Sequence, residues 1–425
     1  MKINRKILII AGAVLFLTLA AVTTGICLGN RTKDIKVGFY ELDSDTENIF
    51  VELIKDSFTA DKKSPSVSFT HLDQADDSVD LILMPMGKIQ DNLISTIETG
   101  KKKNPSLPLS VMSETSSSIR QKAVLIENNA ISIPILMDNV EMDILNDALA
   151  VTNTQQLQTW ADIEKFATES KKNFPYPIVF AGADPVTTLS VITALTECFS
   201  GNEAYLEAVN SISEFFGNKD YIPDSSEIAE FLDTIASSPE SPLYAALSTL
   251  ARWINSGLIH PDIFNMTKRD VEIYMENHYS SIVIMTLSDH RSMSTQAIKN
   301  FTSLPRALGN GGNSVGYFPS SRPAAKRYLT GSVISAVPLT KNKALTTLVK
   351  TMLSSNFQAD LSFKTGLGPV NSQCQSPDIQ SDDVRFFVAA TNPPLTPLSQ
   401  AAFSDQKAIE SFTLEITTFV KRMRR

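Results

Sequence analysis

The sequence predicts an α/β protein made of two lobes and preceded by an apolar N-terminal helix. Its 425 residues exceed the roughly 250–300 residues that one compact core usually reaches. The composition, 43% hydrophobic and 20% charged, is that of a folded globular chain. From residue 35 onward, short apolar runs of strand type alternate with longer runs of helical spacing, the pattern of sheets covered by helices.

The N-terminal segment has the pattern that export machinery reads. Lys2, Arg5 and Lys6 precede an uncharged stretch over residues 7–30, which is strongly apolar as far as Ala21. The positive end of such a segment stays in the cytoplasm. We therefore expect residues 1–30 to carry the rest of the chain to the periplasmic or extracytoplasmic face of a membrane.

Three fates of this segment are open on the sequence. It could be a signal peptide cleaved after Gly25 or Gly29, or a lipoprotein signal lipidated on Cys27, although Ile26 stands where Gly, Ala or Ser is usual. It could also remain as a membrane anchor. The 22 residues from 7 to 28, at about 1.5 Å each, reach roughly 33 Å and span a bilayer. We favour retention or lipidation over release.

The first part of the body has the element order of a mostly parallel sheet. Residues 35–40 and 80–86 are apolar runs of strand type, and residues 67–72 alternate. Thr46 is a helix-capping residue type and opens a helix to residue 58. The remaining elements of this part are a helix at 87–98 and strands at 123–127 and 131–136.

Helices dominate the middle of the chain. Thr159 to Asp162 reads as a capping-box-like start of the helix 160–169. After a strand at 177–180, helical patterns follow at 185–199, 203–216, 226–236 and 243–255. Gly257 ends the last of them.

The C-terminal part returns to strands before it ends in helices. Strands are expected at 281–287, 314–318 and 328–337. Helices are expected at 343–355, at 357–364 with Gly366 closing it, and over a final region at 399–421.

Charge and cysteine spacing exclude several classes of partner and cofactor. The net charge is −8, and without the three basic residues of the export segment 35 basic face 46 acidic residues, a net charge of −11. A nucleic-acid-binding protein needs a concentrated basic face. Cys27, Cys198 and Cys374 lie far apart and form no CxxC spacing, so no zinc site is expected. Cys198 lies in an apolar helical run, which favours a buried thiol over a disulfide with Cys374.

Catalytic motifs are absent from the sequence. The four histidines lack HExxH spacing, no GxSxG occurs, and the run Gly309-Asn310-Gly311-Gly312 lacks the Lys-Ser/Thr of a P-loop. We therefore expect neither an enzyme nor a bound cofactor.

Several landmarks occur in a fixed order along the chain. They are the run 80–86 before a helix, Ile133-Pro134-Ile135, residues 142–147, residues 159–163, residues 282–285 and the final Gly366-Leu367-Gly368-Pro369-Val370-Asn371. Their order and spacing resemble those of the extracellular solute-binding proteins of ABC importers, in the sugar-binding branch that includes maltose-binding protein. The resemblance covers nearly all of residues 35–425.

The resemblance implies a two-lobed periplasmic-binding-protein fold of type II-like topology, which closes by hinge bending. One lobe would comprise 31–138 and 316–366, the other 139–315 and 367–425. Hinges would lie near 137–138, 316–317 and 366–369. The implied partners are a small polar solute, sugars included, held in the cleft between the lobes, and ABC permease subunits in the membrane.

Residues placed by the resemblance at this cleft are the candidate ligand contacts. They are Tyr40, Glu41, Asp43, Met86, Asp138, Asn139, Asp184, Asp289 and Tyr317. Carboxylate and amide groups exchange hydrogen bonds with a polar ligand, while aromatic or Met surfaces cover its apolar faces. Most candidates also have a structural reading: Asp184 precedes Pro185 as a helix cap does, Asp43 fits a helix entry or a loop, and Tyr40 and Tyr317 fit a core.

Aromatic residues are scarce for a sugar receptor, because sugar rings stack on aromatic planes. The chain has 2 Trp and 9 Tyr, and neither Trp160 nor Trp253 falls at an expected cleft loop. Two hypotheses follow: a receptor that captures a solute, and a ligand-less fold that serves as an envelope or surface interaction protein. A polar, concave cleft supports the first, and a cleft filled by Met and Leu supports the second.

Overall fold

A computed structural model describes residues 34–58, 65–100, 105–152, 157, 160–217, 221–303, 331–378, 380–381, 384 and 396–423. The N-terminal segment 1–30 with Cys27, the helix-capping Thr159, and the expected strand 314–318 with Tyr317 lie outside these residues. Within the described ranges, no helix combines the length and the apolar character needed to cross a membrane.

The elements follow the predicted order closely. The first are β1 (Ile35–Phe39), α2 (Ser44–Ser57), β2 (Val67–His71), β3 (Leu81–Pro85), α3 (Lys88–Gly100), β4 (Leu107–Pro108), the 3₁₀ helix η1 (Leu109–Met112), α4 (Ser117–Arg120), β5 (Val124–Ile126) and β6 (Asn129–Leu145). The helix-rich middle comprises α5 (Asn146–Val151), α6 (Trp160–Ser170), β7 (Ile178–Val179), α7 (Pro185–Ser200), α8 (Asn202–Gly217), α9 (Ser225–Ala236) and α10 (Tyr244–Asn255).

The remaining elements alternate short strands and helices. They are η2 (Ile263–Asn265), α11 (Lys268–Glu276), β8 (Ile282–Thr286), α12 (Leu287–Ser292), α13 (Thr295–Ile298), β9 (Phe301–Ser303), β10 (Gly331–Pro338), α14 (Ala344–Met352), α15 (Ser355–Thr365), β11 (Gly368–Pro369), α17 (Leu398–Ala401) and α18 (Gln406–Met423).

The sheet is mixed rather than mostly parallel. Its strand order is β2-β1-β3-β10-β6-β8-β7. The pairs β1–β2, β1–β3 and β7–β8 are parallel, whereas β10 is antiparallel to both β3 and β6, and β6 is antiparallel to β8. The sheet is mixed because β10, from a distant part of the chain, lies between β3 and β6 and runs antiparallel to both.

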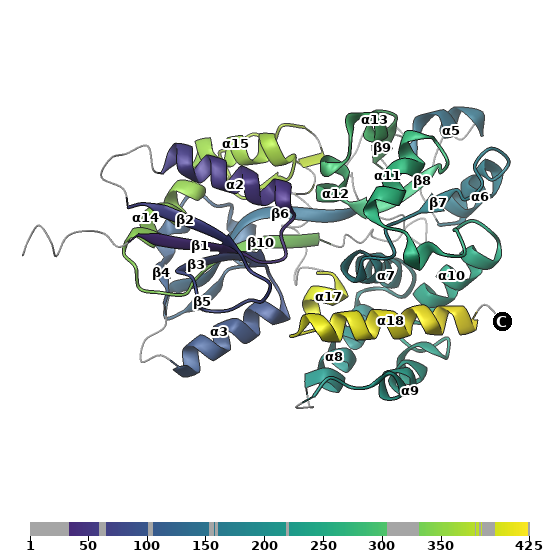
Figure 1. Cartoon of the computed structure of the whole chain (residues 1–425), viewed down its shortest axis with the longest axis horizontal. Coiled ribbons are helices and arrows are strands. Elements are labelled where there is room, and N and C mark those ends of the chain that lie inside the picture. The colour runs from purple at the N-terminus through teal and green to yellow at the C-terminus, as the bar shows by residue number, and fades with distance from the viewer. Residues whose placement is uncertain are drawn as a thin grey trace, which may run out of the picture.

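Strand β6 crosses from one half of the molecule to the other (Figure 1). Its first half pairs with β10 from Ile133 to Asn139, and its second half pairs with β8 from Val140 to Ile144. The sequence predicts a strand that ends at residue 136 and a hinge near residues 137–138. The structure instead gives 17 residues in one strand, and the polar side chains are accommodated by partners described below.

Three clusters of buried apolar side chains hold the fold together. The first core packs β1, β3 and the start of β6 under α2, α14 and α15, around Phe50, Leu348 and Phe357. A smaller cluster on the opposite face of that sheet lies under α3 (Figure 1). The second core packs the end of β6 with β7 and β8 against α6 to α10 and α18, around Trp253 and Phe412.

The core side chains of β6 change partners within three residues. Met137 packs in the first core and Val140 in the second. Asp138 and Asn139 lie between them and are also buried. This short polar stretch is therefore where the two cores meet on the strand that connects them.

Two helix boundaries differ from the sequence expectation. Asp43, rather than Thr46, caps α2, because its side chain accepts a hydrogen bond from the Thr46 backbone N–H. The final helical region is two helices, α17 and α18. Between them Asp405 accepts backbone hydrogen bonds from Lys407 and Ala408, which starts a new helix. Cys198 is buried in the second core, as predicted.

Candidate ligand-binding site

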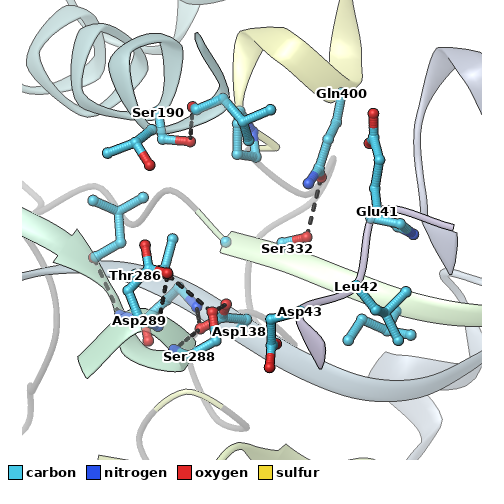
Figure 2. Close-up of a pocket in the computed structure, with 18 of the residues that line it drawn as sticks. Glu41, Leu42, Asp43, Asp138, Ser190, Thr286, Ser288, Asp289, Ser332 and Gln400 are labelled. Atoms are coloured by element: carbon cyan, nitrogen blue, oxygen red, sulfur yellow. Dashed lines mark hydrogen bonds between the residues drawn. The ribbon is translucent and has the colours of Figure 1, made fainter. Parts of the chain in front are cut away.

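A cavity of about 150 Å³ lies between elements of the two cores. That is about ten times the space that one water molecule needs. Its walls are the loop after β1, the middle of β6 and the start of β10 on one side, and α7, α11, α12 and α17 on the other (Figure 2). Polar and charged residues are the majority of the lining, but apolar side chains such as Leu42, Val140, Val186, Ile334 and Leu367 provide much of its surface.

The structure gathers most of the predicted contact residues at this cavity. The six that line it are Glu41, Asp43, Asp138, Asn139, Asp184 and Asp289. They come from four separate parts of the chain, so their meeting depends on the fold and not on local spacing.

The other three predicted contacts do not line the cavity within the described part of the chain. Tyr40 is 5% exposed and packs in the cluster under α3. Met86 packs against the first core, and its backbone N–H donates to Val333. Tyr317 lies outside the described residues. For Tyr40 the structural reading was correct: its ring alternates with Phe39 along the strand and points to the opposite face.

Asp138 links β6 to α12 across the cavity wall. One carboxylate oxygen accepts from the Ser288 hydroxyl at 2.6 Å, and the other accepts from the backbone N–H groups of Asn139 at 2.8 Å and Ser288 at 3.2 Å. Burial raises the pKa of Asp138 to about 6, although these hydrogen bonds act to lower it. The carboxylate is therefore the strand's main contact with the N-terminus of α12.

Asp43 and Asp184 are helix caps at the cavity wall. Asp43 caps α2 at 2.8 Å, and Asp184 accepts from the backbone N–H of Thr187 at 3.0 Å and from its hydroxyl at 2.5 Å. Pro185 takes the first position of α7, where its missing N–H costs nothing.

Lys268 is the cation of the described lining. Its ammonium lies 2.6 Å from the Asp289 carboxylate. Burial acts to lower the pKa of Lys268, but Asp289, with smaller effects from Asp184 and Asp43, raises it above its usual value. Asp289 in turn begins α12 with its backbone N–H bonded to the Thr286 hydroxyl at 3.1 Å.

Glu41 follows β1 with its backbone in the left-handed region, at φ 52°. This conformation is costly for a residue with a Cβ and is often found at functional sites. Glu41 is an exposed residue, but partial burial of its carboxyl raises its pKa, the Tyr40 hydroxyl lowers it, and the Asp184 charge raises it again. Figure 2 shows its side chain extending beside Gln400.

Several lining residues had no signal in the sequence. Ser332 on β10 donates to the Gln400 side chain on α17 at 3.1 Å, and these two elements are 60 or more residues apart. A weaker signal existed at Thr187 and Ser190, which are polar side chains in an otherwise apolar helical run.

The buried group Glu141, Asp143 and His290 lies near this wall but does not line the cavity. Each could offer one metal-ligand atom. His290 Nδ1, however, lies 2.6 Å from Asp143 and 2.8 Å from Glu141, which are hydrogen-bond distances. Burial acts to lower the pKa of His290, but the two carboxylates raise it to about 11. The three side chains form a buried, hydrogen-bonded ion cluster that joins β6 to α12.

Comparison with known proteins gives a result at the level of the fold. No protein-family profile and no curated protein sequence matches the chain. Solved structures do match. The bacterial solute receptor AcbH, described as having an exclusive preference for β-D-galactopyranose, aligns with a TM-score of 0.57 at 11% identity over 93% of this chain and 99% of that one.

Two further structures agree with this match. RafE from Streptococcus pneumoniae has a TM-score of 0.59 at 10% identity, with 93% of this chain and 99% of RafE aligned. A chitin oligosaccharide binding protein has a TM-score of 0.59 at 10% identity, with 92% and 98% aligned.

The likeness extends over nearly the whole of both chains while identity stays near one residue in ten. The predicted recognition is confirmed at the level of architecture: this chain has the α/β fold of the sugar-binding solute receptors of ABC importers.

Proposed function

We propose that the chain is the substrate-binding component of an ABC importer, which captures a small polar solute, with carbohydrates the first class to test, and delivers it to permease subunits in the membrane. The observation that carries this proposal is the polar cavity between elements of the two cores. In open α/β folds, ligands bind at strand ends where chain segments diverge. The neighbours in fold are binding proteins, which supports a receptor rather than an enzyme.

The second hypothesis, a ligand-less interaction protein, required a cleft filled by Met and Leu. The described lining contains Leu42 and Leu367 but no Met, and its charged and hydroxyl side chains outnumber its large apolar ones. This favours solute capture.

We further propose that the two cores are the two lobes, joined at residues 137–140. The predicted division placed residues 367–425 in the second lobe. Leu367, Val370 and Val384, however, pack in the first core, and Leu398 packs in the second. The proposed return to the second lobe therefore lies between residues 384 and 398.

Export and tethering remain proposals that rest on the sequence. Residues 7–28 as an anchor, or a lipid on Cys27, would hold the receptor at the extracytoplasmic face near its permease. Labelling cells with a radioactive fatty acid, with Cys27→Ser as the control, distinguishes lipidation from a retained helix.

A thermal-shift screen of the purified full-length chain tests the receptor function. The panel holds sugars, amino acids and polyols. A solute present at 100 times its dissociation constant adds roughly 2.7 kcal/mol to the free energy of unfolding. At least one solute should raise the melting temperature, whereas no shift across the panel would favour the interaction protein.

A further inference from the structure

The described lining of the cavity carries an excess of negative charge. It contains five carboxylates, Glu41, Asp43, Asp138, Asp184 and Asp289, against the single ammonium of Lys268. Asp138 is part protonated near neutral pH because its pKa lies at about 6. Burial also raises the pKa of Glu41, but Lys268 pairs with only one of the five carboxylates, Asp289. In a cleft with walls of low dielectric, such an excess produces a local potential that attracts cations and repels anions.

The surroundings of Lys268 illustrate this negative potential at one point of the cavity wall. Its ammonium contacts Asp289 at 2.6 Å, and Asp184 and Asp43 also stabilise its charge. The environment therefore already favours one –NH₃⁺ group. A second ammonium would meet the carboxylates that Lys268 does not contact.

Glu41 is the lining carboxylate least used by the fold. Asp43 and Asp184 cap helices, Asp138 holds α12, and Asp289 pairs with Lys268. The Glu41 side chain has a neighbour in the Tyr40 hydroxyl, and it has no role in a helix cap. The side chain extends beside Gln400 in the lining of the cavity (Figure 2).

The described lining contains no aromatic ring. Stacking surfaces for a neutral sugar ring, and aromatic cages for quaternary ammonium groups, both need such rings. A primary ammonium has three N–H donors, and these match carboxylate oxygens through charge-assisted hydrogen bonds.

Building on the proposed receptor function, we infer that the solute of this cavity carries a primary ammonium group, as amino sugars do, and that Glu41 anchors it. Acidic sugars and sugar phosphates are excluded from the same site.

Calorimetric titration of the full-length chain with matched sugars tests this inference. The gluco, galacto and manno scaffolds are each offered as the amino sugar, the neutral sugar and the uronic acid. At least one amino sugar should bind about tenfold or more tightly than its neutral partner, since one charge-assisted hydrogen bond accounts for such a ratio. The uronic acids should not bind.

Glu41→Gln should abolish the preference for the amino form, so that the amino and neutral forms of one scaffold bind with similar affinity. Glu207→Gln, which removes the same charge from the exposed face of α8, should preserve the preference. The amino form should also lose affinity as salt increases, because the added ions screen the pairing.

The outcomes separate the two proposals. A neutral or acidic sugar that binds best, or a preference that survives Glu41→Gln, overturns the ammonium inference and leaves the receptor function standing. Absence of binding for every sugar here and every solute in the thermal-shift panel overturns both.

Discussion

Asp138 is the side chain that joins the crossing strand to the helix beside the cavity. It is 8% exposed and its two oxygens accept three hydrogen bonds. The free-energy cost of desolvating a buried carboxylate is offset only while its hydrogen-bond donors stay in place. Its position therefore fixes the geometry of α12, and with it Ser288 and Asp289 at the cavity wall.

The raised pKa of Asp138 makes stability depend on pH. The group titrates at about 6 in the folded chain and near 3.8 in the unfolded chain. Its contribution is fully present below pH 3.8 and is lost as pH rises toward 6, because ionisation is harder in the folded state. The loss is on the order of 2–3 kcal/mol. In Asp138→Asn, the free energy of unfolding measured with urea should therefore depend less on pH between pH 4 and 7.

Asp45→Asn, on the exposed first turn of α2, is the control and should leave this pH dependence unchanged. An Asp138→Asn profile that keeps the wild-type slope between pH 4 and 6 would show that another group titrates there.

The sequence alone points to the acidic residues of the cavity but not to the side chains that lie beside them. Asp184 and Asp289 follow strands, so an argument from strand ends could find them, whereas Asp138 lies within β6. Lys268 and Gln400 could not be found in this way, because α11 and α17 reach the cavity only through tertiary packing. The predicted contact Tyr40 packs in the cluster under α3, because successive residues of a strand point to opposite faces of the sheet.

Among the elements, α7 depends on its cap. Asp184 satisfies two backbone N–H groups at the start of this helix, most of whose residues are buried. Asp184→Ala should lower the free energy of unfolding by about 1 kcal/mol, the usual cost of losing an N-cap. Asp184→Asn, whose single amide oxygen can still accept one of these hydrogen bonds, should cost less than the Ala variant in guanidinium unfolding.

Equal losses for the Ala and Asn variants would mean that the charge, and not the cap, stabilises α7. The two variants also separate structure from binding, since only the charge should matter to a cationic solute.

Strand β6 shows what a local reading of the sequence misses. Its first residues, Ile131 to Leu136, were predicted as a strand because they are apolar. Its continuation carries Asp138, Glu141 and Asp143, all buried, and buried charges in a strand contradict the usual pattern. Partners far along the chain, Ser288 and His290, resolve the contradiction. Helices such as α7 and α10 were found because their periodicity is local.

For the whole molecule, the turn between β3 and α3 touches α17. A Cβ atom at Gly87 would lie 2.3 Å from the backbone oxygen of Gln400. Gly87→Ala should therefore push α17 away from the turn, at a cost on the order of 1–3 kcal/mol. Hydrogen exchange of the α17 amides should accelerate.

Gly217→Ala is the matched control, because nothing lies within 4 Å of the added Cβ. Unchanged exchange at α17 in Gly87→Ala would mean that the backbone of the turn absorbs the clash, and that the contact does not hold the two cores together.

The most direct measurement of solute capture between the two cores uses a blocked cavity. Ser332 lies at its wall, half-buried and bonded to Gln400, so Ser332→Trp puts an indole into the space a solute would occupy. Thermal shifts of the full-length chain should appear with at least one panel solute for the wild type and for the surface control Ser226→Trp. They should vanish for Ser332→Trp. Wild-type shifts that persist in a folded Ser332→Trp chain would contradict capture at this site.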